Sequence, residues 1–227
     1  MTGEPRGRHR AIADPVAGRA RHLGGAFAAA AVLAVVGCAL LTFAVARGDG
    51  PPPSPEAGPP APAGSRTDAT ALARSVPVQV TIPTIGVKSP LMTLGINADR
   101  TLQVPPLSRA GTAGWYRHSP TPGQRGPAII VGHVDSESGP AVFYELSSLR
   151  PGDAVRVRRA DGVVAVFTVD RVVAFSKDDF PTGLVYGDID HSGLRLITCG
   201  GTYEPDTGGY EDNTVAFASL DRIESAE

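Results

Sequence analysis

From Val76 onward, the chain alternates between short apolar runs and turn residues. The runs are rich in Val, Ile, Thr and Phe and have the length of β-strands. Turn-forming residues separate them, and Pro151-Gly152-Asp153 and Asp161-Gly162 bracket one predicted hairpin. The helical candidate in this part is short, around residues 142–149. About eight strands at regular spacing predict an all-β barrel or sandwich. The predicted strands are VPVQVTI, GVKSPLM, TLQVP, PAIIVGH, DAVRVRR, VVAVFTVDRVVAF, LRLITC and TVAFASL.

The N-terminal part has a different pattern. Residues 23–46 form an uncharged apolar run, which as a helix would be about 35 Å long, enough to cross a bilayer. Arginines precede this run, which favours a cytoplasmic N-terminus. The alternative is a cleaved signal peptide with Ala44-Val45-Ala46 as its cleavage site, but the run is longer than the usual apolar core of a signal peptide. We therefore expect a retained, single-pass membrane anchor, with everything after it outside the cell.

The segment after the apolar run is rich in Pro, Ala and Gly and has too little apolar surface to fold. Its prolines favour an extended spacer. The formal net charge of −2 gives no general case for nucleic-acid binding. The sequence thus predicts a basic tail (1–22), a transmembrane anchor (23–46), a linker (47–75), a folded catalytic domain (76–221) and a C-terminal tail (222–227).

The two cysteines lie in very different surroundings. Cys38 falls inside the apolar run and is interpreted as a small core-type residue. Cys199 ends a predicted strand and precedes Gly200-Gly201. Outside the cell a structural cysteine normally has a disulfide partner, and Cys199 has none in prospect. A buried cysteine that acts as a small hydrophobe is the alternative, but the rigid strand end and the flanking glycines favour a reactive thiol.

A thiol nucleophile needs a proton acceptor nearby. His133 also follows a predicted strand, whereas His118 and His191 lie in loop-like segments and are interpreted as solvent-exposed. Asp135 is a candidate for orienting the imidazole of His133, although capping a turn is the commoner role for such a residue. No third and fourth metal ligand is evident near His133 and Asp135, so we expect no metal or other cofactor.

Several stretches together resemble the sortase family, specifically class F or the closely related class E of Gram-positive bacteria. They are AGWY, PAIIVGHVDS, GPAVFYEL and LRLITCGG, with Gly132-His133 and Thr198-Cys199 in the expected order. The resemblance implies a closed, eight-stranded β-barrel and a membrane-anchored cysteine transpeptidase. Cys199 would cleave an LPXTG-like sorting signal between Thr and Gly through a thioester, with His133 as acid and base. Thr198 and Asp135 would adjoin the substrate.

The resemblance also implies the partners of the reaction. These are surface proteins that carry sorting signals and an amine of a cell-wall precursor, which accepts the cleaved chain. An L,D-transpeptidase also uses a secreted cysteine and histidine in a β-rich domain. That alternative is disfavoured because Ile197 and Thr198 precede the cysteine here.

One position departs from the family pattern. Sortases supply an oxyanion-binding arginine from the strand after the cysteine, and Glu211 stands where we expect it. Arg195, four residues before Cys199 and on the same strand face, is a candidate substitute, with an outward-facing surface role equally open. Arg117 and Arg125 are weaker candidates. Glu211 also leaves a second function open, a catalytically impaired barrel that acts as a binding module at the cell surface.

Overall fold

The computed structural model describes residues 53–55, 71–206 and 208–225. The predicted basic tail, the apolar run at 23–46 that contains Cys38, and most of the predicted linker lie outside these residues. Within the described ranges, no helix has both the length and the apolar character needed to cross a membrane.

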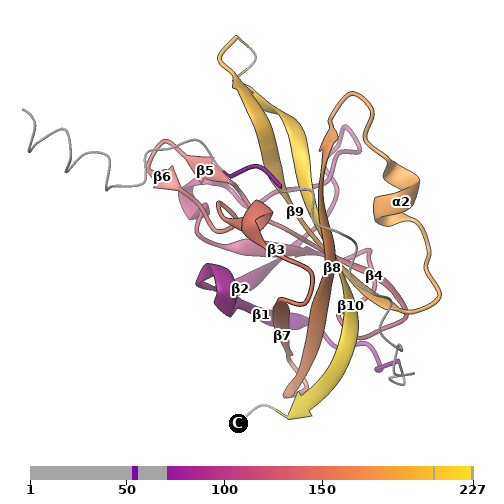
Figure 1. Cartoon of the computed structure of the whole chain (residues 1–227). Helices are drawn as coiled ribbons and strands as arrows, with labels where there is room; N and C mark the ends of the chain where they lie inside the picture. The colour runs from indigo at the N-terminus through magenta and orange to yellow at the C-terminus, as the bar shows by residue number, and fades with distance from the viewer. Residues whose placement is uncertain (1–52, 56–70, 207, 226–227) are drawn as a thin grey trace, which may run out of the picture. The chain divides into compact units, whose positions relative to one another are not determined.

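Eight strands close into a barrel in the order β1-β2-β3-β4-β9-β10-β8-β7, with β7 pairing back onto β1 (Figure 1). This confirms the closed eight-stranded barrel that the family resemblance implies. The predicted hairpin is present as the antiparallel pair β7–β8. The barrel strands are β1 (Pro77–Ile82), β2 (Val87–Leu94), β3 (Ala113–Tyr116), β4 (Gly126–Val131), β7 (Ala154–Arg159), β8 (Val163–Ser176), β9 (Ser192–Glu204) and β10 (Gly209–Ser225).

The remaining elements are short. The strands β5 (Asp135–Ser136) and β6 (Gly139–Pro140) form a separate two-stranded sheet beside the barrel. The predicted helix around 142–149 is only a 3-10 turn, η3 (Leu146–Ser148). A five-residue helix that the pattern did not predict, α2 (Thr182–Tyr186), connects β8 to β9. The other short helices are η1 (Pro83–Ile85) and η2 (Leu107–Arg109).

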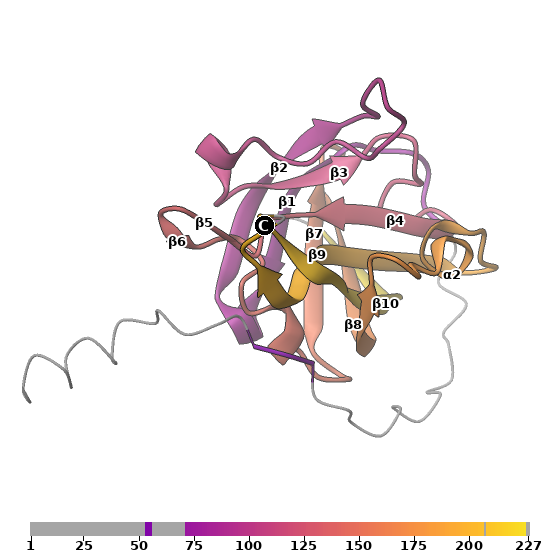
Figure 2. The same ribbon diagram turned by 90° about the horizontal axis from the view of Figure 1, so that it is seen from above.

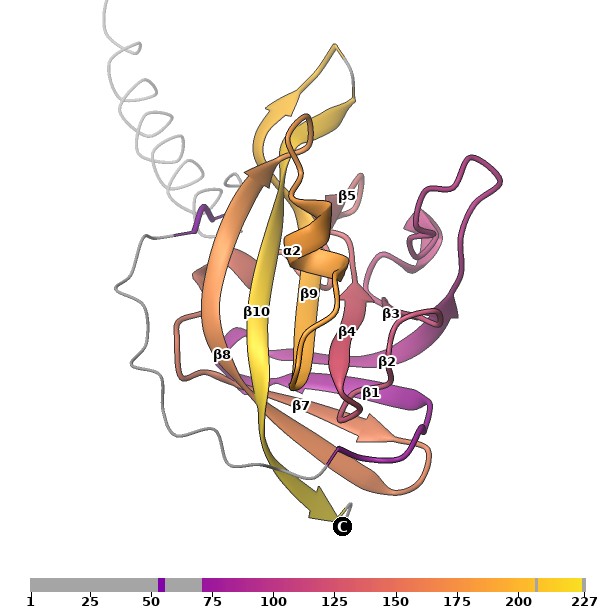
Figure 3. The same cartoon turned by 90° about the vertical axis from the view of Figure 1, so that its right-hand side faces the viewer.

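Apolar side chains of the barrel strands belong to two clusters, one inside the barrel and one on its outer face. One fills the barrel interior with residues from all eight strands, including Leu194 and Leu196 of β9. The other lies on the outer face of β4, β9 and β10, where Val185 of α2 packs with Ile129 and Ile197. Figure 3 shows α2 in front of these strands, and Figure 2 shows it from above at the outside of the barrel. In β9, therefore, even-numbered positions face the barrel interior and odd-numbered positions face outward.

The packed part of the chain extends past both predicted domain boundaries. β10 continues to Ser225, because its end pairs with β8. At the other end, the Arg159 guanidinium is 2% exposed and needs acceptors inside the protein. It donates to the carbonyl oxygens of Ala73 and Pro122, at 2.6 Å each, and to the Asp161 carboxylate. The chain before Val76 is thereby attached to the barrel.

Candidate active site

Cys199 and His133 lie at the same end of two neighbouring parallel strands. Strands β4 and β9 pair in parallel up to Val131 opposite Ile197, and the Gly132 N–H continues the ladder by donating to the Ile197 carbonyl at 3.1 Å. His133 and Cys199 are each two residues beyond that last pair. Neighbouring strands are about 4.8 Å apart, so the register brings the histidine backbone alongside that of the cysteine. Cys199 is partly exposed and has a free thiol.

The two glycines after Cys199 are required by close packing. A Cβ on Gly200 would lie 2.4 Å from Thr214 Oγ1, and one on Gly201 would lie 2.6 Å from Asp212 Oδ2. Gly201 also has a φ of +77°, which side-chain-bearing residues rarely adopt. The register between β9 and β10 shifts at this point, between Tyr210 and Asp212. The glycines therefore allow a bulge that bends the hairpin directly beyond the cysteine.

The His133 imidazole is oriented by a backbone carbonyl. Its Nε2 lies 2.6 Å from the Pro105 oxygen, which belongs to the connection between β2 and β3. A carbonyl only accepts hydrogen bonds, so Nε2 carries the hydrogen in this contact and Nδ1 is the acceptor nitrogen of the neutral ring. The loop around His133 is further fixed by the Phe143 N–H, which donates to the His133 carbonyl at 3.0 Å. No feature of the sequence pointed to Pro105.

Asp135, a candidate for orienting the histidine, is bonded to a different residue. Its Oδ2 accepts a short hydrogen bond from the Tyr210 hydroxyl of β10. Burial, and next this hydrogen bond, raise the pKa of the Tyr210 phenol well above its usual range. The negative charges of Asp135 and Cys199 act in the same direction. Tyr210 is thus a neutral donor within electrostatic range of Cys199. No separate feature of the sequence pointed to Tyr210.

Thr198, predicted to adjoin the substrate, pairs with Thr214 and has the parity of the barrel-interior positions. It is 5% exposed, and its Oγ1 has no hydrogen-bond partner within the described residues. Strand alternation places its side chain on the opposite face of β9 from Cys199. The role of Thr198 beside the substrate stays a prediction.

Arg195 shares the outer face with Cys199, as the alternation requires, but it is held at a distance from it. Four residues along a strand span about 13 Å, and Ile197 occupies the position between them. The Arg195 guanidinium lies over the Phe217 ring, 4.6 Å from its centroid, and donates to the Leu194 carbonyl at 3.1 Å. Burial, and next the charge of Arg171, lower the pKa of Arg195 to about 10, so it stays charged at neutral pH. These contacts describe a packed structural residue.

The other arginine candidates lie toward the opposite end of the strands. Arg125 immediately precedes β4, whose first residue pairs with Ser192, about 23 Å along β9 from Cys199. Arg117 follows β3, which runs antiparallel to β4 and so ends away from His133. Glu211 is exposed, and its carbonyl accepts the Lys177 N–H at 2.9 Å. The carboxylate at the expected arginine position therefore faces solvent.

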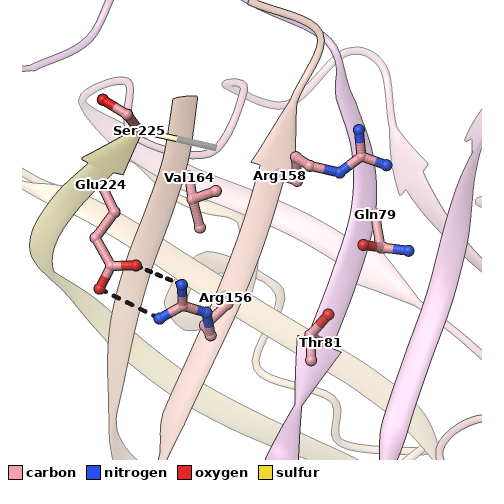
Figure 4. A pocket seen from close by; sticks show the side chains of 7 residues that line it. All are labelled: Gln79, Thr81, Arg156, Arg158, Val164, Glu224 and Ser225. Atoms are coloured by element: carbon pink, nitrogen blue, oxygen red, sulfur yellow. Dashed lines mark hydrogen bonds and ion pairs between the residues drawn. The ribbon is translucent and has the colours of Figure 1, made fainter. Parts of the chain in front are cut away.

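Two surface hollows in the described residues lie elsewhere. Neither includes Cys199 or His133. One, of about 510 Å³, is at the start of β4 beside Arg125. The other, of about 500 Å³, lies on the outer surface of β1, β7, β8 and β10, where the Arg156 guanidinium bonds both carboxylate oxygens of Glu224 (Figure 4). Figure 4 shows its lining residues, which are Gln79, Thr81, Arg156, Arg158, Val164, Glu224 and Ser225.

A free thiol and an imidazole on neighbouring strand ends of a closed β-barrel fit the class of cysteine enzymes that act by nucleophilic attack. Comparison with known families agrees with this class. The Sortase domain profile matches residues 80–221, which is more than half of the chain. The chain belongs to the sortase family, and it is therefore a cysteine transpeptidase by family.

Solved structures support the fold. Sortase A of Listeria monocytogenes is 17% identical with a TM-score of 0.50, and the match covers 68% of this chain and 92% of that one. Sortase C of Streptococcus pneumoniae is 20% identical with a TM-score of 0.50, covering 66% and 69%. Sortase A of Corynebacterium diphtheriae is 20% identical with a TM-score of 0.50, covering 67% and 63%. A search of curated protein sequences gave no match.

Proposed function

We propose that this protein is a membrane-anchored sortase of class F, or of the related class E, which transfers proteins bearing an LPXTG-like signal to a cell-wall amine. The observation that carries the proposal is the parallel register of β4 and β9, which sets His133 beside Cys199. The motifs AGWY, PAIIVGHVDS and LRLITCGG support the class. The uncharged run at 23–46 and the Pro-rich segment after it support an anchor followed by a spacer.

The first half of the reaction cleaves the signal. The Cys199 sulfur attacks the threonine carbonyl carbon, and the carbonyl π electrons move onto oxygen. As the tetrahedral intermediate collapses, the C–N bond to glycine breaks, and His133 gives its Nδ1 proton to the departing amine. The products are a thioester on Cys199 and a free glycine amine. Nδ1 has this role because Nε2 is engaged with the Pro105 carbonyl.

The second half forms the new bond. An incoming amine attacks the thioester carbonyl, His133 takes up a proton from it, and the C–S bond breaks to regenerate the cysteine. The thioester keeps the free energy of the cleaved peptide bond, so the transfer needs no ATP. Exposed apolar side chains at Val104 and Leu107, 58% and 63% exposed, flank the Pro105 segment and support contact with the apolar part of a peptide.

The experiment uses the full chain in mild detergent with an LPXTG-type peptide and an amine. The expected result is cleavage between Thr and Gly with transfer to the amine, and no product from Cys199→Ala. A thioester of Cys199 should be detected by mass spectrometry. A chain that binds the peptide but leaves it intact, at the same level as Cys199→Ala, would refute the proposal.

Glu211 favours a second candidate, a sortase barrel that binds sorting signals without turnover. A carboxylate cannot donate a hydrogen bond to an oxyanion, so the usual charge stabilisation is missing at that position. A mild thiol-reactive probe separates the two functions. An active site labels at Cys199 near neutral pH and is protected by sorting peptides, whereas an inert barrel labels slowly with or without them.

A further inference from the structure

The bond between Tyr210 and Asp135 joins the two halves of the site. Tyr210 is in β10, next to the hairpin that begins with Cys199, and Asp135 is two residues after His133. The hydroxyl of Tyr210 donates to Asp135 Oδ2. The nucleophile hairpin and the histidine loop are thus connected by a charge-assisted hydrogen bond, the stronger kind of hydrogen bond in proteins.

The position of Tyr210 is built into the hairpin. The bulge at Gly201 shifts the register directly after Tyr210, between Tyr210 and Asp212. The Tyr203 ring on the opposite strand packs edge-on against Tyr210 with centroids 5.3 Å apart. Rigid aromatic packing of this kind limits the rotation of the phenol. The hydroxyl is therefore delivered to Asp135 by a defined backbone and not by a flexible side chain.

The histidine loop is held from several sides, but mostly by its own neighbourhood. The Ala141 N–H donates to the Val134 carbonyl at 2.9 Å, and the Phe143 N–H donates to the His133 carbonyl. Beyond the strand ladder itself, Tyr210 supplies a side-chain tie from the hairpin that carries the cysteine. Glu211, the next residue of β10, is exposed, whereas the Tyr210 hydroxyl reaches Asp135 in the loop.

We propose that Tyr210 and Asp135 act as a positioning pair, which fixes the loop of His133 against the hairpin of Cys199 in a site without the usual arginine. The pair sets the spacing of the sulfur and the imidazole and takes no proton itself. The inference rests on the proposed function for its kinetic test, and a peptide-independent measurement tests it separately. It assigns Asp135 a partner on β10 in place of a triad role with His133.

The test compares Tyr210→Phe with Tyr203→Phe. Both variants also carry Cys38→Ala, so that Cys199 is the one thiol that reacts in the assays. Tyr203→Phe removes the hydroxyl oxygen from the neighbouring ring, and Tyr203 is half exposed. Tyr210→Phe should lower kcat for thioester formation by about tenfold or more with KM within about twofold, because small misplacements of reacting groups cost that much. Loss of this hydrogen bond should lower the melting temperature of Tyr210→Phe by about 3–12 °C relative to Tyr203→Phe, so kcat is compared per folded molecule.

Asp135 variants complete the test. Asp135→Asn keeps an oxygen that accepts from Tyr210 and should retain activity within about threefold, whereas Asp135→Ala should match Tyr210→Phe. The double variant Tyr210→Phe/Asp135→Ala should be no slower than either single variant, as expected for partners in one interaction. Losses that multiply in the double variant, or a Tyr210→Phe as fast as Tyr203→Phe, would overturn the pair.

The rate of Cys199 alkylation by iodoacetamide at neutral pH is the measurement that needs no peptide. It reports the pairing of the thiol with the imidazole and should fall in Tyr210→Phe relative to Tyr203→Phe. A parent chain that does not process peptides refutes the proposed function alone. Equal alkylation rates in the two tyrosine variants refute the positioning pair, whatever the peptide result.

Discussion

The glycine before His133 tests how tightly the histidine loop is packed. A Cβ at Gly132 would lie 2.5 Å from Val142 Cγ1 and 2.7 Å from Phe143 Cδ2. Phe143 is fully buried in the barrel core, so its ring has little room to move. Gly132→Ala should therefore cost about 1–3 kcal/mol as an overpacked core position. At about 2–4 °C per kcal/mol for a domain of this size, the melting temperature falls by about 2–12 °C.

The same substitution should reduce activity more than stability. The Gly132 N–H donates to the Ile197 carbonyl, so relief of the clash moves the histidine backbone relative to β9. A displacement of about 1 Å at a catalytic group costs about 100-fold in rate. Thermal unfolding and thioester formation are measured against Gly111→Ala, whose Cβ meets nothing within 4 Å. A Gly132→Ala protein that equals this control in both measurements would refute the packing argument.

Three further predictions follow from the charged residues. The Arg159 guanidinium holds the pKa of Asp161 below its usual 3.8, so the carboxylate stabilises the fold above the unfolded-state pKa, and this contribution is lost as the pH falls through the lower folded-state value. Asp161→Asn should thus cost about 1 kcal/mol near pH 7 once solvent screening is allowed for. In denaturant titrations this difference should fade as the pH falls below the unfolded-state pKa, and a pH-independent difference contradicts the prediction. Arg195→Ala should lower the unfolding free energy by about 1–3 kcal/mol, because the contact with Phe217 is lost. Its kcat per folded molecule should stay within about threefold of the parent value. A severe loss of kcat in a folded protein would instead support a role of Arg195 in the groove. Glu211→Arg should raise the rate of thioester formation about tenfold or more, with Glu211→Gln as the charge control, and an unchanged rate would show that position 211 does not reach the oxyanion.

Seven of the eight barrel strands were predictable because they are local patterns. The predicted strand TLQVP was wrong, since only Leu102 there forms an isolated bridge, and β3 was not among the predicted strands. Alternating or continuous apolar runs mark β7, β8, β9 and β10 directly, and turn residues mark the β7–β8 hairpin. The short helices were not predictable in the same way. Five residues at Thr182–Tyr186 are too few to show a helical period, and α2 is stabilised by packing Val185 onto the outer cluster. The segment at 142–149 has helix-like spacing, but its side chains are used to pack against Gly132 and the core.

The candidate site was predictable only where chemistry and strand ends coincide. Cys199 and His133 stand out because each follows an apolar strand, and the parallel pairing that joins them is a property of the fold. Pro105 acts through a backbone carbonyl, which any residue would offer, so its type carries no signal. Tyr210 depends on a register shift that only the three-dimensional pairing defines. Arg195 was a candidate only because it shares a strand face with Cys199. A shared face does not reveal that the Ile197 side chain lies between the two residues.

The electrostatic character of the site follows from which groups are neutralised by partners. An arginine at position 211 would add a positive charge beside the thiolate, whereas Glu211 adds a negative one that is exposed and screened by solvent. Asp135 is a second carboxylate near the thiol, and the Tyr210 hydroxyl stabilises its charge without adding one. In the proposed reaction, His133 is then the group on the neighbouring strand end that exchanges protons with Cys199. A site that depends on one imidazole for proton transfer is sensitive to the placement of that ring. The Pro105 carbonyl and the Tyr210–Asp135 bond therefore matter more here than in a barrel with an arginine at position 211.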